Sequence, residues 1–243
     1  MQDTVFELLS CDAIAKNTYR WILKGDTSQV TAPGQFVNIK LDGFYLRRPI
    51  SVCDVEGDLL TIIFKVVGEG TEKMAEAEAG EKFLTLTGLG NGYDLEKCGA
   101  RPVLIGGGAG VPPMYLTARR LIARGVTPTV ILGFNTADEV FYKDEFEALG
   151  CTVLVTTVDG SLGIKGFVTD ALGHIDYTYF YTCGPEPMLR AVYNAASTSG
   201  QLSFEERMGC GFGACMGCSC KTKYGNKRIC RDGPVLQKEE IIW

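Results

Sequence analysis

Four cysteines near the end of the chain restrict its architecture more than any other feature. They lie in a glycine-rich loop and in a short segment that follows it: Cys210, Cys215, Cys218 and Cys230. The spacing C-x4-C-x2-C with a later fourth cysteine is typical of a [2Fe–2S] cluster, whose irons are bound by four thiolates. Glycines between the ligands let the backbone approach the cluster and donate N–H groups to its sulfur atoms. The spacing therefore predicts a [2Fe–2S] site and a role in electron transfer.

Two other uses of these cysteines fit the sequence less well. Structural zinc sites favour two short knuckles of the C-x2-C type, and only Cys215 and Cys218 form such a pair. A disulfide framework is disfavoured because ten cysteines in 243 residues without a signal peptide indicate a reducing compartment.

Cys220 is a further thiol beside the ligands. In an extended segment it would point to the same side as Cys218, so it could replace that ligand. The spacing already supplies four ligands without it. We therefore expect Cys220 to stay outside the ligand set.

Composition argues against several functional classes. Hydrophobic residues make up 46% of the chain, yet no apolar run is long enough to cross a bilayer, so we expect a soluble, cytoplasmic protein. The net charge of −5, without a basic stripe, argues against nucleic acid as a partner. A single histidine, His174, leaves little room for catalytic triads or histidine-ligated metals.

Residues 1–99 show a pattern typical of a small antiparallel β-barrel. Short β-type runs are separated by turns rich in Gly, Asp and Pro. The predicted strands are residues 5–10, 18–23, 36–41, 50–54, 59–66 and 83–87. A short helix is predicted over residues 72–77.

From residue 100 the pattern changes to alternating strands and helices, which predicts a doubly wound parallel α/β domain over residues 100–200. The predicted strands are residues 102–105, 129–134, 151–156 and 179–183. The predicted helices are residues 112–124, 143–149, 168–172 and 186–199. Residues 201–243 are predicted to form a small [2Fe–2S] domain, so the fold class is α+β with several domains.

Two short motifs in the barrel segment point to a bound anionic cofactor. The run Arg48-Pro49-Ile50-Ser51 places a cation and a hydroxyl on either side of a proline. Further on, Gly70 and Thr71 lead into the predicted helix with N–H groups that can bind an anion. In this order the motifs resemble the FAD-binding barrel of the ferredoxin reductase superfamily.

That resemblance implies roles for the residues of both motifs. Arg48 would offset the charge of the pyrophosphate, and Ser51 would form a hydrogen bond near the flavin N5 atom. Gly70 and Thr71 would donate to the pyrophosphate. A backbone segment would line the flavin edge: Ile63, Phe64 and Lys65.

The first strand of the α/β domain ends in a glycine turn, and the helix that follows begins with proline. The glycines of the turn are Gly106, Gly107, Gly108 and Gly110. Such a turn lets the backbone approach a pyrophosphate at a helix N-terminus. It departs from G-x-G-x-x-G, and no acidic residue ends the next strand.

The last predicted strand of this domain ends in Cys183-Gly184-Pro185. In the superfamily this turn lies beside the nicotinamide ring. The resemblance therefore implies that Cys183 shapes the site of hydride transfer. A structural cysteine buried before a helix is the alternative.

Along its whole length the chain resembles the electron-transfer subunits of NAD-linked, two-subunit (class 1B) bacterial dihydroorotate dehydrogenases. The most specific runs are residues 48–51, 88–93, 159–166 and 206–210. The resemblance implies three cofactors: FAD, a [2Fe–2S] cluster and NAD. It also implies a catalytic partner that oxidises dihydroorotate on FMN in pyrimidine biosynthesis, in a heterotetramer of two of each subunit. These subunits carry an extra cysteine two places after the third ligand, which supports Cys220 as a non-ligand.

Two alternatives stay open. The chain could serve another reductase, of the sulfite reductase or ferredoxin–NADP transhydrogenase type. The latter type resembles it less because its cluster loop replaces the first cysteine by Asp. The chain could also be a binding or sensor module without turnover.

Two further expectations concern the surroundings of the sites. The turn over residues 134–137 offers no Arg or Lys to a 2′-phosphate, which favours NAD over NADP unless Arg119, Arg120 or Lys143 reaches it. Phe212, Ala214 and Met216 alternate with small and ligating residues of the cluster loop. They are predicted either to contact the partner subunit or to shield the cluster from water.

Overall fold

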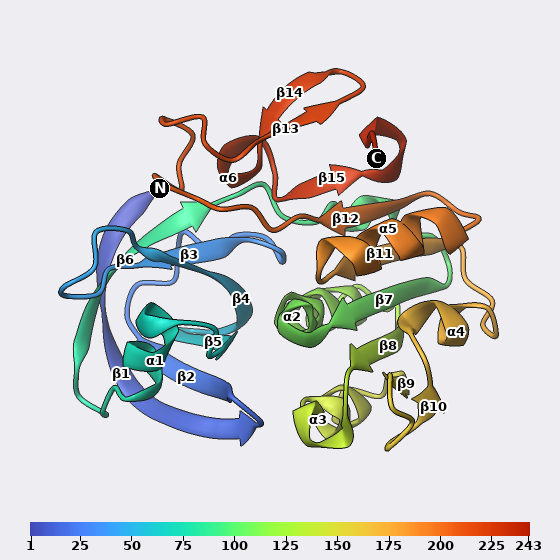
Figure 1. The fold of residues 1–243 in the computed structure, drawn as a ribbon, viewed down its shortest axis with the longest axis horizontal. Coiled ribbons are helices and arrows are strands. Elements are labelled where there is room, and N and C mark those ends of the chain that lie inside the picture. Colours follow the sequence, from blue (N-terminus) through green and yellow to red (C-terminus); the bar gives the residue numbers. More distant parts are fainter.

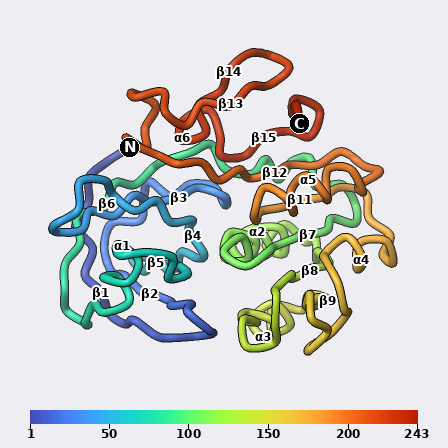
Figure 2. Tube along the Cα trace, viewed as in Figure 1, coloured from blue at the N-terminus to red at the C-terminus, as the bar shows by residue number.

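The computed structural model describes residues 1–243, which form two lobes joined by a C-terminal segment that lies along the top of both (Figure 1). The N-terminal lobe is a β-barrel and the second lobe is an α/β sheet. The trace in Figure 2 follows the chain from the barrel into the sheet, then back toward the barrel in its orange part, and finally to the C-terminus on the side of the second lobe. None of the helices is both long and apolar enough to cross a lipid bilayer.

The barrel is closed by six antiparallel strands in the order β1-β2-β5-β4-β3-β6, which confirms the predicted architecture. The strands are β1 (Gln2–Ala15), β2 (Thr18–Lys24), β3 (Phe36–Ile39), β4 (Arg48–Glu56), β5 (Leu59–Lys65) and β6 (Lys82–Leu89). Alternate residues point inward, and Trp21, Val37 and Ile62 are among the fully buried side chains of the barrel core. Helix α1 (Glu69–Ala75) begins three residues before the predicted start at residue 72.

The second lobe is a seven-stranded sheet in the order β10-β9-β8-β7-β11-β12-β15. Its strands are β7 (Pro102–Gly107), β8 (Thr129–Phe134), β9 (Thr152–Thr157), β10 (Ile164–Lys165), β11 (Tyr179–Cys183), β12 (Gly200–Ser203) and β15 (Val235–Gln237). All neighbours are parallel except β12 and β15.

Helices cover both faces of this sheet, as a doubly wound fold requires. The helices are α2 (Val111–Ile122), α3 (Lys143–Ala148), α4 (Val168–Leu172) and α5 (Glu186–Ala195). Apolar residues of α2 and α3 share one core cluster, and those of α4 and α5 share the other. The predicted parallel α/β fold is confirmed.

The C-terminal segment adds a hairpin, a short helix and an edge strand. These are β13 (Ser219–Thr222), β14 (Gly225–Arg228), α6 (Ile229–Asp232) and the strand β15 already described. Four 3₁₀ turns complete the elements: η1 (Leu95–Lys97), η2 (Gly108–Gly110), η3 (Ala137–Glu139) and η4 (Lys238–Glu240). The sheet of the second lobe thus continues past residue 200, because β12 and β15 belong to it. The domain limits at 99/100 and 200/201 remain a prediction.

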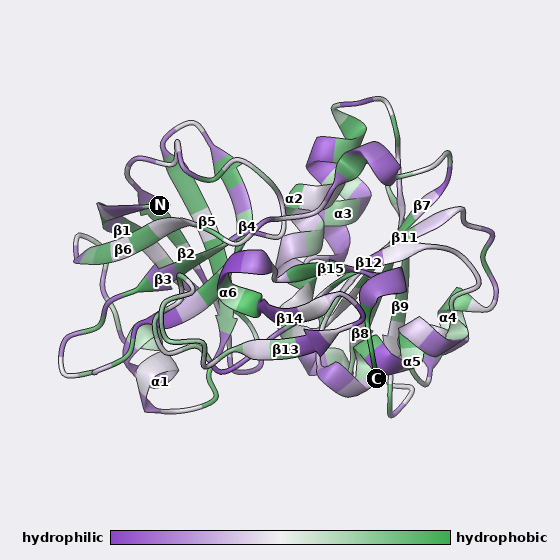
Figure 3. Ribbon diagram, turned by 90° about the horizontal axis from the view of Figure 1, so that it is seen from above, coloured by the Kyte–Doolittle hydropathy of each residue, from purple (hydrophilic) through white to green (hydrophobic).

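Helix α2 connects the two lobes. Leu116 on this helix packs into the barrel core, and Arg119 forms ion pairs with Asp54 and Glu56 of β4. Figure 3 shows the apolar stretches of the barrel strands on the left and of the α/β elements on the right, with α2 between them. The lobes therefore form one packed body in which the space between them can hold a site.

Candidate cofactor sites

The four predicted cluster ligands lie in the loop before β13 and in α6. Cys210 Sγ accepts hydrogen bonds from the backbone N–H groups of Ala214 (3.2 Å) and Cys215 (3.5 Å). The backbone N–H of Cys230 donates to Cys218 Sγ at 3.4 Å. These hydrogen bonds link the cysteines in two pairs, Cys210 with Cys215 and Cys218 with Cys230. Two pairs of thiols suit a cluster of two irons with two thiolates each.

The loop already favours the thiolate form at one ligand. Burial would raise the pKa of Cys210, but backbone N–H groups of Cys215 and Phe212 lower it to about 6. Burial and the neighbouring thiols of Cys218 and Cys210 raise the pKa of Cys230 to about 12. Thiols that lie this close together lose their protons when they bind a metal cation, because coordination requires the thiolate form. The donor set therefore fits an iron–sulfur cluster.

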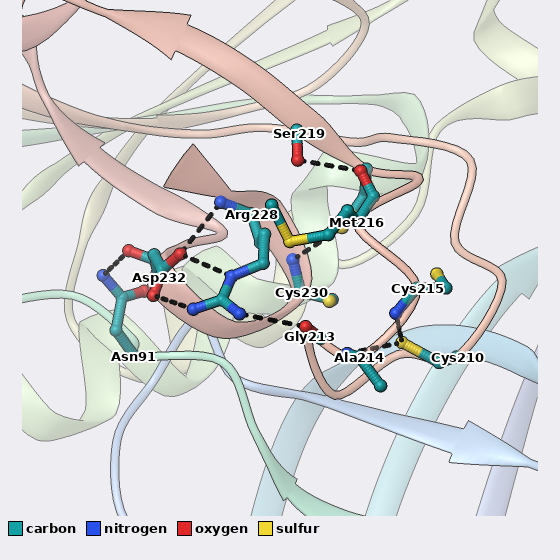
Figure 4. A network of polar contacts seen from close by, with 11 residues as sticks. Asn91, Cys210, Gly213, Ala214, Cys215, Met216, Ser219, Arg228, Cys230 and Asp232 are labelled. Carbon is teal, nitrogen blue, oxygen red and sulfur yellow. Dashed lines mark hydrogen bonds and ion pairs between the residues drawn. The ribbon is translucent and has the colours of Figure 1, made fainter. Parts of the chain in front are cut away.

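An ion pair that sequence reasoning missed holds the loop in place (Figure 4). Arg228 Nε donates to Asp232 Oδ2 at 3.0 Å, and its Nη1 donates to the carbonyl of Gly213 at 3.0 Å. Asn91, at the end of the barrel, donates to the carbonyls of Asp232 (3.4 Å) and Val235 (2.8 Å). The i, i+4 spacing of Arg228 and Asp232 was the only local signal for this arrangement.

Cys220 lies in β13 opposite Lys227, outside the two hydrogen-bonded pairs. Its side chain is half-buried, and burial raises its pKa. Its exclusion from the ligand set remains a prediction.

The two predicted pyrophosphate-binding motifs of the barrel lie together. A Cβ atom on Gly70 would lie 2.0 Å from Arg48 Nε, so the guanidinium rests directly on the start of α1. Arg48 also lies 4.7 Å over the ring of Phe44 and donates to the carbonyl of Leu46 at 2.6 Å. A guanidinium held beside the backbone N–H groups at the start of a helix suits the binding of a diphosphate.

Thr71 has a role within the turn that precedes it. Its hydroxyl accepts from the N–H groups of Val67 (2.9 Å) and Gly68 (3.2 Å) and donates to the carbonyl of Gly68 at 2.8 Å. The hydroxyl therefore shapes the anion-binding turn, and a direct bond from it to the pyrophosphate remains a prediction. Pro49 and Ser51 face Asn38 and Phe36 across the β3–β4 ladder.

A pocket between the lobes brings the predicted flavin edge to the glycine turn. Its walls include Ile63, Phe64 and Lys65 of β5 and Gly108 of the turn after β7. Lys65 Nζ crosses the pocket to Glu139 Oε1 at 2.8 Å. Burial would raise the pKa of Glu139, but its hydrogen bonds with Lys65 and Asn135 lower it, so the ion pair stays charged. A flavin edge on β5 would thus face a dinucleotide bound at the turn.

The glycine turn and the Cys183 turn end adjacent parallel strands. Cys183 pairs with Gly106 in the β7–β11 ladder. From β7 the chain adds β8, β9 and β10 on one side and β11 and β12 on the other, so the strand order reverses at this ladder. Ligands of doubly wound folds bind at this point. A Cβ atom on Gly110 would lie 2.1 Å from the carbonyl oxygen of Cys183 and 2.6 Å from the backbone nitrogen of Gly184. The two turns are therefore packed backbone to backbone.

Cys183 is half-buried beside this junction. Burial raises its pKa to about 12, so the thiol is protonated at neutral pH. It can shape the site as a small neutral group and is poorly suited to act as a nucleophile.

Comparisons with known proteins agree with this geometry. Residues 205–242 match the family described as the iron-sulfur cluster binding domain of dihydroorotate dehydrogenase B, and residues 104–194 match an oxidoreductase NAD-binding domain. A solved structure of an NADH-dependent reduced ferredoxin-NADP oxidoreductase has a TM-score of 0.90 and 30% identity, covering 98% of this chain and 90% of that one. A ferredoxin NADP+ reductase from Neisseria gonorrhoeae with bound FAD and NADP has 19% identity and a TM-score of 0.70, covering 80% and 90%, and shares the fold.

Curated relatives match almost the full chain. The "Dihydroorotate dehydrogenase B (NAD(+)), electron transfer subunit" of Fusobacterium nucleatum subsp. nucleatum is 44% identical over 244 residues, covering 94% of each chain. The subunit of the same name from Bacillus mycoides is 44% identical over 245 residues, also covering 94% of each. The resemblance predicted from the motifs is confirmed: the chain belongs to the family of dihydroorotate dehydrogenase B (NAD(+)) electron transfer subunits.

Proposed function

We propose that this chain is the electron-transfer subunit of an NAD-linked dihydroorotate dehydrogenase of pyrimidine biosynthesis. It would pass electrons from FMN of a catalytic subunit through [2Fe–2S] and FAD to NAD+. The observation that carries the proposal is the order of the three candidate sites. Cys218 and Cys230 share an apolar cluster with Phe36 of β3, and the pocket along β5 includes Gly108 of the glycine turn in the second lobe.

When bound, the cluster and the flavin supply the exchange between single electrons and the hydride that NAD+ accepts. The chain's own residues bind and orient these groups. Arg48 and the start of α1 would hold the FAD pyrophosphate, while the backbone of Ile63, Phe64 and Lys65 would line the flavin edge. The glycine turn would hold the NAD pyrophosphate, and the turn at Cys183 would keep the nicotinamide close to the flavin.

The chain offers no site for the oxidation of dihydroorotate itself, so the proposal includes a partner. That partner is the FMN-containing catalytic subunit, in a cytoplasmic heterotetramer of two of each. Co-expression of both subunits and an assay of dihydroorotate-dependent NAD+ reduction test this. A purified complex with FMN, FAD and cluster all loaded but without this activity would overturn the proposal.

The structural relative with 30% identity supports a second candidate, a ferredoxin-coupled NADPH reductase subunit. Cys210 favours the first candidate, since the cluster loop of the ferredoxin–NADP transhydrogenase type has Asp in place of this first cysteine. Replacing dihydroorotate by reduced ferredoxin in the same assay discriminates the two.

NAD(H) is expected to be preferred over NADP(H). Asp159 lies beside the turn over residues 134–137, because its backbone N–H donates to the carbonyl of Asn135 at 3.2 Å. Its Oδ1 accepts from Ser161 Oγ at 2.6 Å. Ser161 Oγ in turn accepts from the N–H of Ala137 at 2.8 Å. Hydrogen bonds from Ser161 lower the pKa of Asp159, which keeps a negative charge beside this turn. We expect kcat/KM for NADH to exceed that for NADPH by at least about tenfold, or about 1.4 kcal/mol.

Two of the three cations that could have reached this turn are engaged elsewhere. Arg119 pairs with Asp54 and Lys143 pairs with Glu147. Asp159→Asn should reduce the preference for NADH, with Asp176→Asn on the far loop as the control. Steady-state kinetics with both cofactors measure the preference, and an equal or higher kcat/KM for NADPH would contradict it.

Phe212 and Met216 are predicted to contact the catalytic subunit. Their side chains are 43% and 53% exposed on the cluster loop. Phe212→Asp should weaken the complex by about 2 kcal/mol, because it puts a charge into an apolar contact. NADH–dye activity needs only the flavin and the nicotinamide site and should be unchanged.

Gel filtration of the co-expressed variant measures the complex. Phe167→Asp, which changes an equally large exposed side chain on the α/β lobe, is the control. A Phe212→Asp complex that stays intact would leave Phe212 only the role of shielding the cluster.

A further inference from the structure

Strand β4 carries a β-bulge where it meets the second lobe. Its register against β5 shifts between Val52 and Asp54, so Cys53 is one extra residue in β4. Val52 packs in the barrel core, whereas Cys53 packs in the core of the second lobe. Asp54, the next residue, pairs with Arg119 of α2 and does not return to the barrel core. The bulge therefore turns two successive residues of β4 toward the second lobe.

Arg119 binds two carboxylates of this strand at once. Its Nη1 donates to Asp54 Oδ2, and its Nη2 lies 2.8 Å from Glu56 Oε1. The Asp54 side chain is only 14% exposed, and its Oδ1 is completely buried without a hydrogen-bond partner. A guanidinium is a planar, rigid fork, so it fixes the direction as well as the distance of the groups that it binds. The ion pair therefore sets the position of α2 along β4.

The two elements that this ion pair joins also carry the candidate flavin and dinucleotide sites. Figure 1 shows α2 beside β4 at the junction of the lobes. Strand β4 contains Ser51, which is predicted to lie near the flavin N5 atom, shortly before Asp54. Helix α2 begins at Val111, directly after the glycine turn, and Arg119 follows about 12 Å further along the helix axis. Helix α2 is thus a rigid connection between the turn for the dinucleotide and the strand for the flavin.

Resting on the proposed function, we propose that Arg119 and Asp54 are positioning residues for hydride transfer between NAD(H) and FAD. Their ion pair fixes α2 on β4, and with it the distance from a nicotinamide on the second lobe to a flavin on the barrel. A displacement of about 1 Å can lower a rate about a hundredfold. Leu116 of α2 packs into the barrel core, but apolar contact has no direction, so it holds the lobes together without fixing their register.

Arg119→Met tests this role in the co-expressed complex with its flavins and cluster loaded. It keeps an unbranched side chain and removes the guanidinium. We expect the limiting rate of FAD reduction by NADH to fall at least about tenfold. The Kd of NADH should stay at the wild-type level, because the glycine turn is unchanged. Anaerobic stopped-flow measures both, and an NADH titration should show less of the long-wavelength absorbance that a nicotinamide stacked on a flavin gives.

The double variant Asp54→Leu/Arg119→Met separates positioning from cohesion of the lobes. Arg119→Met alone leaves a buried carboxylate unpaired and should lower the melting temperature, whereas an apolar pair in place of both charges should restore it. We expect the limiting rate and the long-wavelength absorbance of the double variant to stay reduced. Arg101→Met is the control, because it breaks the ion pair with Asp176 within the second lobe and should change neither readout.

A wild-type limiting rate and absorbance in Arg119→Met would overturn the proposal. Recovery of both in the double variant would overturn it too, since cohesion of the lobes would then be enough. If Arg119→Met does not fold, the double variant decides by the same two readouts. Neither readout requires dihydroorotate, so failure of the proposed function would appear separately, in the dihydroorotate assay of the wild-type complex.

Discussion

Replacing any one of the four predicted cluster ligands by serine is expected to abolish the visible [2Fe–2S] absorption and to reduce dihydroorotate-dependent NAD+ reduction to background. The variants are Cys210→Ser, Cys215→Ser, Cys218→Ser and Cys230→Ser. Serine stays protonated near neutral pH and is a hard ligand, whereas iron–sulfur clusters select soft thiolates. Visible spectra, iron and sulfide content, and the two assays measure the effect. NADH–dye activity should survive, because the pocket between the lobes contains none of these cysteines.

Cys220→Ser is the control for this series. Cys220 lies in β13, outside the two pairs in which the backbone connects Cys210 with Cys215 and Cys218 with Cys230. Its variant should keep both the absorption and the partner-dependent activity. A Cys220→Ser protein without a cluster, together with a fully loaded Cys218→Ser protein, would contradict the ligand assignment.

The sequence predicted most of the regular structure because its patterns are local. Alternation of apolar and polar residues marks the barrel strands, and apolar strands followed by amphipathic helices mark the α/β lobe. Strand β8 and helix α4 have the bounds that the pattern predicted. The short strands β12 and β15 were not predicted, because each has few residues and their pairing joins segments far apart in the chain. Helix α5 ends at Ala195 rather than at the predicted residue 199.

The same division applies to the sites. Cysteine spacing and the glycine turns are local signals, so the cluster loop and the dinucleotide turn could be predicted. The Lys65–Glu139 ion pair and the contact of Asn38 with Gly211 join segments that lie far apart in the sequence. No local pattern distinguishes Asn38 from any polar residue in a strand. Its burial and its missing hydrogen-bond partner became visible only with the packing of the cluster domain on the barrel.

Gly110→Ala is expected to destabilise the α/β lobe and to weaken NADH binding. Gly110 has φ −85°, which any residue can adopt, so backbone strain gives no reason for glycine here. Space does, because the added Cβ would lie 2.1 Å from the carbonyl oxygen of Cys183. It would also lie 2.6 Å from the backbone nitrogen of Gly184, and backbone cannot move aside as a flexible side chain could. Overpacking of this kind costs about 3 kcal/mol, which lowers the melting temperature by roughly 6–12 °C.

The loss of NADH binding should follow from the same displacement. The turn at Cys183 would have to move away from β7, and it is the turn predicted to hold the nicotinamide against the flavin. Gly173→Ala is the matched control, since Gly173 has φ −65° at the end of α4 and its nearest atoms would lie 3.8 Å from the new Cβ. Thermal unfolding and NADH titration of both variants measure the difference, while cluster absorption reports that the C-terminal domain is intact. A Gly110→Ala protein with the melting temperature and NADH affinity of Gly173→Ala would mean that the two turns can separate without consequence, and the close junction would then have no role in binding the dinucleotide.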